Sequence, residues 1–269
     1  MDERPIGVFD SGLGGLTSVK KLAMFLPGED IIYLGDTSRV PYGSRSRDTI
    51  IKYARQDAAF LAGFDIKAMV IACNTVSTTA YEILNEFYDI PVYEVVSAAV
   101  KAAVSLTENG RIGVIGTTAT INSGAYETAI REIKPELIVY SAACPLFVPL
   151  VENGRIDVND VAAMSIAGEY LAEQLLSGVD TLILGCTHYP LLRNVISGIM
   201  GPDVRLIDSG EETARVVAED LRERGLLSGS DKVGTIRYFV TDSTEGFSVL
   251  ASRFLESDVQ GQVEQVELE

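Results

Sequence analysis

The stretch TLILGCTHYPLLRNVI (residues 181–196) contains the repeating unit of this chain, a strand followed by a short polar turn and a helix. Its first residues are aliphatic or β-branched, as in a buried strand. Pro190 suits the first position of a helix, and the aliphatic residues after it recur at helical spacing. Cys186 and His188, the only histidine of the chain, stand where the predicted strand gives way to the predicted helix.

The same unit recurs along almost the whole chain. Short apolar runs alternate with segments of helical period, which is typical of βαβ units and a parallel sheet. In one such segment, Ala80, Ile83, Leu84 and Phe87 form a single apolar stripe, and Gly63 is placed to end another helix. We expect strands at IGVF (6–9), DIIYLG (30–35), AMVIAC (68–73), VYEVV (92–96), RIGVIG (111–116), ELIVYS (136–141), TLILGC (181–186), VRLID (204–208) and IRYFVTD (236–242).

A weak internal echo suggests two similar halves. IGVFDSG (6–12) resembles IGVIGTT (112–118), and IACNT (71–75) resembles LGCTH (184–188). A duplicated α/β unit explains this echo, and so does chance, because parallel strands rich in Val, Ile and Gly look alike. No low-complexity linker is present, so any crossing between halves is expected to be short and ordered.

Composition places the chain among soluble globular proteins. It has 269 residues, of which 47% are apolar and 22% are charged. No apolar run approaches the roughly 18 residues of a membrane span. The start, MDERPIGVFD, lacks the pattern of a secretory signal. Three cysteines do not make a disulfide framework, and a reducing cytoplasm fits them best.

The formal net charge of −16 restricts the partners. Nucleic acid and anionic membrane surfaces are disfavoured, because binding them needs clustered Lys and Arg. An anionic small ligand would have to be held by backbone N–H groups and helix N-termini working against the overall field.

The glycine-rich segment DSGLGGLT (10–17) after the first strand allows three interpretations. It matches a dinucleotide-binding GxGxxG at only two of three glycines, with Thr17 in the third place. A tight strand-to-helix turn is the interpretation that we prefer to dinucleotide binding. Consecutive amides at a helix N-terminus could also cradle a small anion such as a carboxylate. The absence of Gly-Lys-Ser/Thr excludes a nucleotide P-loop.

Cys73 and Cys186 share one setting. Each ends a predicted strand and is followed by small polar residues and a helix. Ligands of open α/β sheets bind beyond the carboxyl ends of the strands, where both thiols would lie. A nearby helix N-terminus favours thiolate and lowers a pKa that starts at about 8.5. Inert packing is the alternative for a strand-end cysteine, and Cys144 lacks this setting and is interpreted as structural.

Two such thiols suggest two kinds of chemistry. Zinc held by Cys73, Cys186, His188 and Cys144 is disfavoured, because the spacing contains no CxxC and no HxxxH. Proton transfer is the other: a thiolate removes a proton from one face of a carbon and a thiol delivers one to the opposite face. The product of that reaction is the mirror image of the substrate.

The motifs DSGLGG, GDTSRVPYGSRS, ACNT, GTTAT, ACPLFVPLVENG and GCTHYP, in this order, closely resemble the glutamate racemases. The resemblance runs from about Ile6 to the final predicted strand. It implies cofactor-independent conversion of L-glutamate to D-glutamate for peptidoglycan synthesis, in the cytoplasm and without a metal. It allows a homodimer, although no interface is evident in the sequence.

The resemblance also implies roles for individual residues. Cys73 and Cys186 would be the acid and base residues, with Asp10 assisting Cys73, His188 assisting Cys186 and Glu152 as a third polar helper. A helix cap is the alternative for His188 and a solvated loop carboxylate for Glu152. The implied substrate contacts are Asp10, Ser11, Pro41, Tyr42, Gly43, Ser44, Asn74, Thr75, Thr117, Thr120, Thr187 and His188.

The expected fold is α/β, with two similar open-sheet domains of largely parallel strands flanked by helices and the active site in the cleft between them. The resemblance places residues 1–97 with 208–269 in the first domain and residues 98–207 in the second. Three functional alternatives remain: a racemase of aspartate or hydantoins or a related isomerase, an NAD-dependent oxidoreductase built on GLGGLT, and a non-catalytic amino-acid-binding protein.

Overall fold

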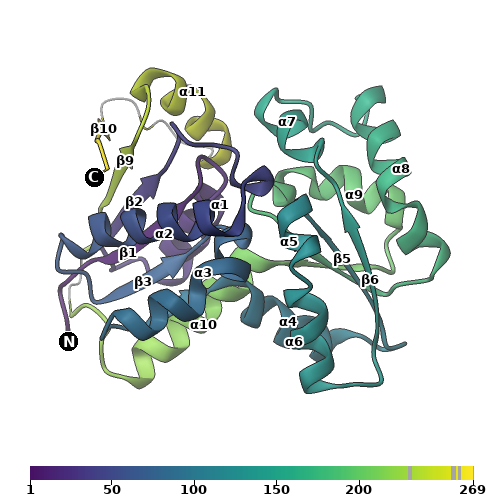
Figure 1. Ribbon diagram of the computed structural model, residues 1–269, viewed down its shortest axis with the longest axis horizontal. Coiled ribbons are helices and arrows are strands. Elements are labelled where there is room, and N and C mark those ends of the chain that lie inside the picture. Colours follow the sequence, from purple (N-terminus) through teal and green to yellow (C-terminus); the bar gives the residue numbers. More distant parts are fainter. Residues whose placement is uncertain (230–231, 256–258, 260–261, 269) are drawn as a thin grey trace.

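Two parallel β-sheets form the framework of the protein (Figure 1). The computed structural model describes residues 1–229, 232–255, 259 and 262–268. The sheets have the strand orders β10-β9-β2-β1-β3-β4 and β6-β5-β7-β8. The strands are β1 (Ile6–Asp10), β2 (Ile31–Gly35), β3 (Ala68–Ile71), β4 (Val92–Glu94), β5 (Arg111–Gly116), β6 (Ile138–Ala143), β7 (Thr181–Gly185), β8 (Arg205–Asp208), β9 (Ile236–Val240) and β10 (Val263–Gln265).

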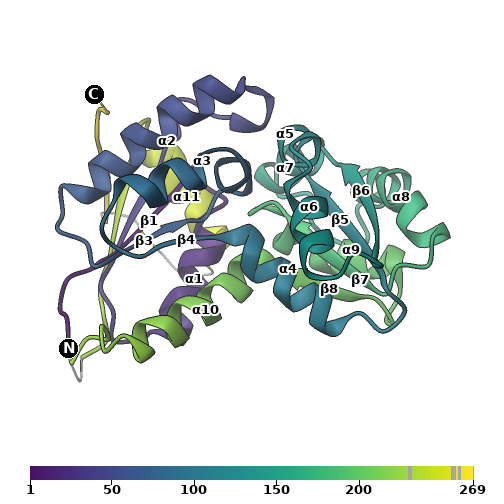
Figure 2. The same ribbon diagram turned by 60° about the horizontal axis from the view of Figure 1, so that its bottom comes forward.

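Helices flank both sheets, so the expected α/β class with two open, parallel sheets is confirmed (Figures 1 and 2). The α-helices are α1 (Leu16–Phe25), α2 (Arg47–Ala62), α3 (Asn74–Phe87), α4 (Val95–Leu106), α5 (Thr118–Asn122), α6 (Ala125–Ile133), α7 (Phe147–Glu152), α8 (Val161–Leu176), α9 (Arg193–Met200), α10 (Ser209–Glu223) and α11 (Thr244–Leu255). Two short 3₁₀ turns, η1 (Tyr42–Ser44) and η2 (Tyr189–Leu192), precede α2 and α9.

The two sheets repeat one arrangement. The order β2-β1-β3-β4 of the first sheet matches β6-β5-β7-β8 of the second, with β1 and β5 in corresponding inner positions. The sequence echo falls on these corresponding strands: 6–12 lies on β1 and 112–118 on β5. Cys73 therefore follows β3 at the position that Cys186 occupies after β7.

Two helices carry the chain between the sheets. α4 leads from β4 of the first sheet to β5 of the second, and α10 leads back from β8 to β9. The two helices pack against each other, and Figure 2 shows them side by side between the halves. Each starts on a buried acidic cap: Glu94 accepts hydrogen bonds from Val96 and Ser97 amides, and Asp208 does so for α10. The crossings are ordered, as expected.

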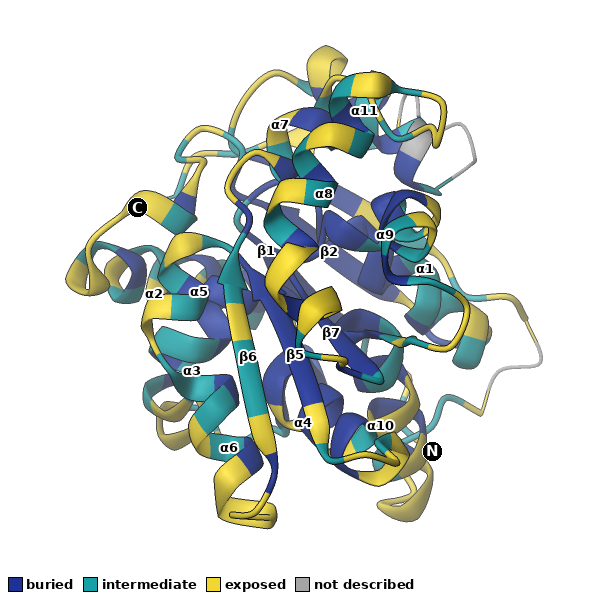
Figure 3. Cartoon of the chain, turned by 90° about the vertical axis from the view of Figure 1, so that its right-hand side faces the viewer, coloured by how far each residue is buried: buried dark blue, intermediate teal, exposed yellow. Residues whose placement is uncertain are grey.

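Burial explains why the inner strands read as continuous apolar runs. Every residue of β1, β2 and β7 is buried, as in a parallel sheet covered on both faces. By contrast, the edge strand β6 has no fully buried residue and is partly exposed along its length (Figure 3).

The ends of α2, β4 and α3 can be compared with the sequence predictions. Gly63 caps the C-terminus of α2, as predicted. The strand predicted over 92–96 ends at Glu94, because that side chain caps α4, which starts at Val95. Phe87 was placed on the buried stripe of its helix and is 77% exposed, since α3 ends there and only Ala80 and Leu84 of the predicted stripe are fully buried.

The domain division stays a prediction. The boundary at 97/98 falls inside α4, and the one at 207/208 falls just before the last residue of β8. Among the residues that the structure describes, no helix combines the length and apolar character needed to cross a membrane.

Candidate active site

A cavity of about 290 Å³ lies at the carboxyl ends of strands from both sheets. Its wall comes from segments that follow β1, β2, β3, β5, β6 and β7, as expected for a site beyond the strand ends of an open α/β fold. The lining residues are Ser11, Gly12, Leu13, Val40, Pro41, Tyr42, Gly43, Ser44, Cys73, Asn74, Thr75, Thr117, Thr118, Pro145, Val148, Pro149, Glu152, Cys186, Thr187 and His188.

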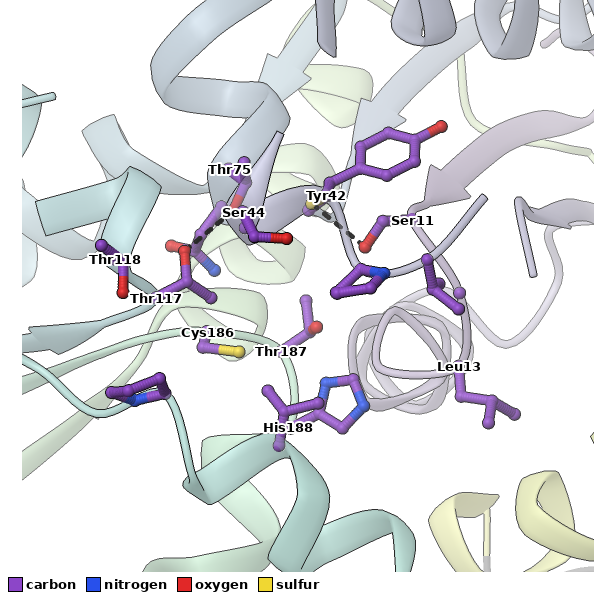
Figure 4. A pocket seen from close by; sticks show the side chains of 18 of the residues that line it. Ser11, Leu13, Tyr42, Ser44, Thr75, Thr117, Thr118, Cys186, Thr187 and His188 are labelled. Atoms are coloured by element: carbon purple, nitrogen blue, oxygen red, sulfur yellow. Dashed lines mark hydrogen bonds between the residues drawn. The ribbon is translucent and has the colours of Figure 1, made fainter. Parts of the chain in front are cut away.

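The two thiols enter this cavity from different sheets. Cys73 is the N-cap residue of α3, and Cys186 follows β7; each is 5% exposed. Figure 4 shows the Cys186 sulfur directed into the cavity beside Thr187 and His188. The Cys73 thiol lies 3.6 Å from the Ser11 hydroxyl, to which it donates.

The acidity of the thiols differs from the expectation of a lowered pKa. Burial and, to a smaller extent, the nearby Asp10 carboxyl raise the pKa of Cys73 to about 12, because the Ser11 hydroxyl and the Val76 and Ser11 amides offset only part of the rise. Burial likewise raises the pKa of Cys186, against a smaller opposing effect of the His188 amide. Loss of solvation outweighs the dipoles at the strand ends.

Asp10 lies behind the cavity wall. Its carboxyl group is 1% exposed, and burial raises its pKa, while His188 and the amides of Gly15, Gly12 and Ser11 act in the opposite direction. The Gly12 amide donates to Oδ2 at 3.0 Å, whereas Oδ1 has no hydrogen-bond partner. Amides of the glycine-rich turn thus serve a carboxylate of the protein itself, which sits next to Cys73.

His188 is held on the other side of the cavity. Its Nε2 lies 3.2 Å from Glu152 Oε1, which favours a proton on Nε2. A Cβ on Gly14 would lie 2.5 Å from the His188 Nδ1, so the imidazole packs directly on the β1–α1 turn. Glu152 ends α7, with its side chain 39% exposed, rather than lying in a loop. The structure brings His188, Glu152 and Cys186 together at one wall.

Three threonine hydroxyls form a cluster between the sheets. Thr75 Oγ1 lies 3.0 Å from Thr117 Oγ1 and 3.3 Å from Thr120 Oγ1, and Thr117 and Thr120 are 3.0 Å apart. Thr75 belongs to α3, whereas Thr117 caps α5, so the cluster joins the two halves (Figure 4). Thr120 is buried behind the other two and does not line the cavity.

Asn74 is fixed by two residues that the sequence did not single out. Its Nδ2 donates to Ser209 Oγ at 3.3 Å, and the Tyr126 hydroxyl donates to its Oδ1. These partners come from α10 and α6. No local motif marks them, because they become neighbours of Asn74 only in the folded chain.

Tyr42 lines the cavity, but its hydroxyl points away from it (Figure 4). The hydroxyl is hydrogen-bonded to Asp36 and lies 3.1 Å from Asp57 Oδ2. Arg39 pairs with both carboxyl groups, at 2.5 Å and 3.0 Å. This cluster anchors the loop before α2, and a Cβ on Gly43 would lie 2.9 Å from the Thr117 Cβ.

Most predicted site residues line one cavity. Asp10 and Thr120 lie behind its wall, and the other predicted residues form it. The sequence analysis did not name seven residues of the wall, although all seven lie within the motifs quoted above. The missed lining residues are Gly12, Leu13, Val40, Thr118, Pro145, Val148 and Pro149.

The described lining contains no Lys or Arg, so the cavity offers an anion hydroxyls, amides and helix N-termini. Within the described part of the chain, no group of His, Cys, Asp and Glu side chains is arranged to hold a metal ion.

The glycine-rich turn is tightly packed: a Cβ on Gly35 would lie 2.4 Å from the Gly12 carbonyl oxygen, to which Tyr33 donates at 2.7 Å.

The fold and the paired cysteines define a class of isomerase. The sequence model of the Asp/Glu/Hydantoin racemase family matches residues 17–217, and the chain belongs to that family.

Glutamate racemases are among the proteins most similar to this chain. The glutamate racemase of Geobacter metallireducens is 50% identical over 269 residues, covering 100% of this chain and 98% of that protein. The crystal structure of a glutamate racemase isoform from Bacillus anthracis matches with a TM-score of 0.94 at 39% identity, covering 100% and 99% of the two chains. The Francisella tularensis glutamate racemase in complex with D-glutamate matches with a TM-score of 0.93 at 43% identity, with the same coverage.

Proposed function

We propose that this chain racemises glutamate by moving the α-proton between two thiols, Cys73 and Cys186. One observation carries the mechanism: two buried thiols enter one cavity from corresponding positions in opposite sheets. A base on each face of the substrate Cα can remove the proton from one side and return one to the other. The similarity to glutamate racemases favours glutamate over aspartate as the substrate.

Burial of the thiols helps the chemistry. The α-proton of an amino acid is very weakly acidic, and a thiolate whose conjugate acid has a pKa of about 12 is a stronger base than an ordinary thiolate. Asp10 beside Cys73 and His188 beside Cys186 are the groups that take up or supply the thiol proton. Glu152 accepts a hydrogen bond from the imidazole and helps to fix its orientation.

Fixed dipoles hold the anionic substrate. Hydroxyl and amide groups of Ser11, Asn74, Thr75, Thr117 and Thr187 face the cavity and suit the two carboxylates of glutamate. In a water-poor site such dipoles stabilise developing negative charge without a cation. The reaction uses no cofactor in this proposal, and the enzyme supplies D-glutamate for peptidoglycan in the cytoplasm, alone or as a homodimer.

A circular-dichroism assay over a panel of amino acids tests the substrate. Optical activity of L-glutamate and D-glutamate is expected to decay towards zero with the purified chain, and activity on aspartate but not glutamate would overturn the choice.

The roles of the thiols are tested with Cys73→Ser and Cys186→Ser. Each is expected to lower kcat by about 10³-fold, within the range of lost acid–base catalysis. In deuterium oxide, each variant should be impaired more in the exchange step that depends on the missing thiol. Cys144→Ser is the matched control, because Cys144 is buried outside the cavity lining. Equal loss in every partial reaction, or an equal effect of Cys144→Ser, would contradict the two-base mechanism.

A further inference from the structure

The C-terminal helix α11 carries an apolar stripe that ends at the candidate active site. Phe247, Ala251 and Phe254 recur at helical spacing, and all three are buried. Phe247 packs on Tyr33 and Tyr238, with ring centroids 6.3 and 6.5 Å away. Phe254 instead contacts the His188 imidazole: the ring centroids are 5.5 Å apart and the planes meet at 89°.

This contact completes an enclosure around the imidazole. Gly14 of the β1–α1 turn packs against Nδ1, Glu152 of α7 is hydrogen-bonded to Nε2, and Phe254 of α11 meets the ring edge-on. The His188 side chain is only 9% exposed as a result. Figure 1 shows α11 on the side of the first half that is nearer to α7.

The chemistry of the contact suits an orienting role. Perpendicular packing of two aromatic rings is a preferred geometry that fixes the plane of each ring. The phenyl ring cannot take up a proton, so it restricts the orientation of the imidazole without competing for the proton that His188 exchanges. An aliphatic side chain of similar size would exclude water as well, but it would leave the ring plane less defined.

We propose that Phe254 is a positioning residue that holds the His188 imidazole in the orientation needed for proton exchange with Cys186. This inference rests on the proposed function. α11 lies between β9 and β10 of the first sheet, whereas His188 follows β7 of the second. A helix of the first half thereby helps to position a residue that the second half contributes to the cavity.

Because His188 is the only histidine, its ring C–H cross-peaks in a ¹³C–¹H spectrum of histidine-labelled protein need no assignment. The test compares Phe254→Leu and Phe254→Met with the matched control Phe247→Leu, which removes a buried ring from the same stripe without touching His188. Thermal unfolding of each variant reports how far it is destabilised.

Both Phe254 variants are expected to move the His188 cross-peaks and to lower kcat about tenfold, as for a misplaced catalytic group, with KM changed less than about twofold. Phe247→Leu should leave the peaks in place and kcat within about twofold of the unsubstituted protein. If the Phe254 variants match Phe247→Leu in either readout while the unsubstituted protein racemises glutamate, the inference is overturned. Absence of racemisation by the unsubstituted protein would instead contradict the proposed function.

Discussion

At the scale of single residues, two buried carboxyl groups share one arginine beneath the loop that carries Tyr42. Asp36 and Asp57 are both fully buried, and Arg39 is the cation paired with each. The Tyr42 hydroxyl contacts both carboxyl groups, yet one O–H donates only one hydrogen bond. Burial and the neighbouring Asp36 raise the pKa of Asp57 far above its usual value, and Arg39 and Tyr42 lower it by less, so we expect Asp57 to hold a proton in the folded protein.

The pH dependence of stability tests this protonation. The pKa of Asp57 in the folded protein lies above the unfolded value of about 3.9, so the folded state binds more protons. The stability it contributes is present below about pH 4 and is lost as the pH rises through the folded pKa. Asp57→Asn cannot ionise, and we expect it to gain in unfolding free energy relative to the unsubstituted protein as the pH rises. Urea unfolding from pH 5 to pH 8 measures this.

Asp57→Ala is the control for the hydrogen bonds themselves. It leaves the Tyr42 hydroxyl and Arg39 with one partner fewer and should lower the unfolding free energy by about 1–3 kcal/mol even at pH 5. A constant difference between Asp57→Asn and the unsubstituted protein across this pH range would show that Asp57 is charged in the folded state.

The sequence predicted which cysteines line the cavity better than it predicted their surroundings. Cys73 and Cys186 could be found because a strand end followed by polar residues and a helix is a local pattern. Their raised pKa values depend on how much of the folded chain covers them, which no local pattern encodes. For the same reason Asp57 and Phe254 carried no signal, since their partners lie far away along the chain.

At the scale of elements, the turn between β1 and α1 has glycines because other groups approach it closely. A Cβ on Gly15 would lie 2.5 Å from the Asp10 Cβ, and one on Gly14 would lie 2.1 Å from Thr187 Oγ1. Thr17 of α1 also donates to the Thr187 carbonyl oxygen at 3.0 Å. The β1–α1 turn therefore packs directly against Thr187 and His188, which follow Cys186 in the chain. This close packing accounts for the glycines of the turn, so no bound nucleotide is needed to explain them.

Gly14→Ala should damage catalysis more than folding. The added methyl group would displace Thr187 and His188, and we expect kcat to fall by about 10²-fold, as for a displacement of about 1 Å at a reacting site. The matched control is Gly198→Ala in α9, where the nearest atom to the new Cβ is the Met164 Cε at 3.8 Å. There the gain in helix propensity should raise the unfolding free energy by up to about 1 kcal/mol. Steady-state kinetics and urea unfolding of both variants measure these effects, and a Gly14→Ala enzyme of normal kcat would refute the packing argument.

Elements were predictable where one local signal dominated. The nine expected strands all exist because buried parallel strands are continuous apolar runs. The sequence does not predict the edge strand β10 (Val263–Gln265), since two of its three residues are polar and none of them is buried. Phe87 continues the apolar stripe of α3 but is exposed, because the surface that covers the helix does not extend to its last residue.

At the scale of the whole molecule, two similar halves meet at a cavity whose described lining has no Lys or Arg, in a protein of net charge −16. α4 and α10, packed together, are the connections between the sheets in the described part of the chain. The repeated strand order was only hinted at by the sequence echo, because pairing between distant strands is a property of the assembled sheet. The negative field of the whole chain opposes an anionic substrate, while local dipoles attract it.

This balance predicts an unusual response to salt. Screening weakens interactions between exposed charges over about 10 Å at 0.1 M salt, but it scarcely affects hydrogen bonds inside a buried cavity. Raising the ionic strength should therefore weaken the long-range repulsion between the negative protein and glutamate more than it weakens the hydrogen bonds that hold glutamate in the cavity. We expect KM to fall about twofold between 10 and 200 mM salt, with kcat unchanged. The sodium salt of a bulky sulfonate is the control for chloride binding, because the bulky anion cannot enter a cavity of about 290 Å³ as readily as chloride. If screening causes the effect, the two sodium salts should change KM equally. A KM that rises with both salts would contradict this prediction, because it would mean that an attractive positive charge dominates substrate binding.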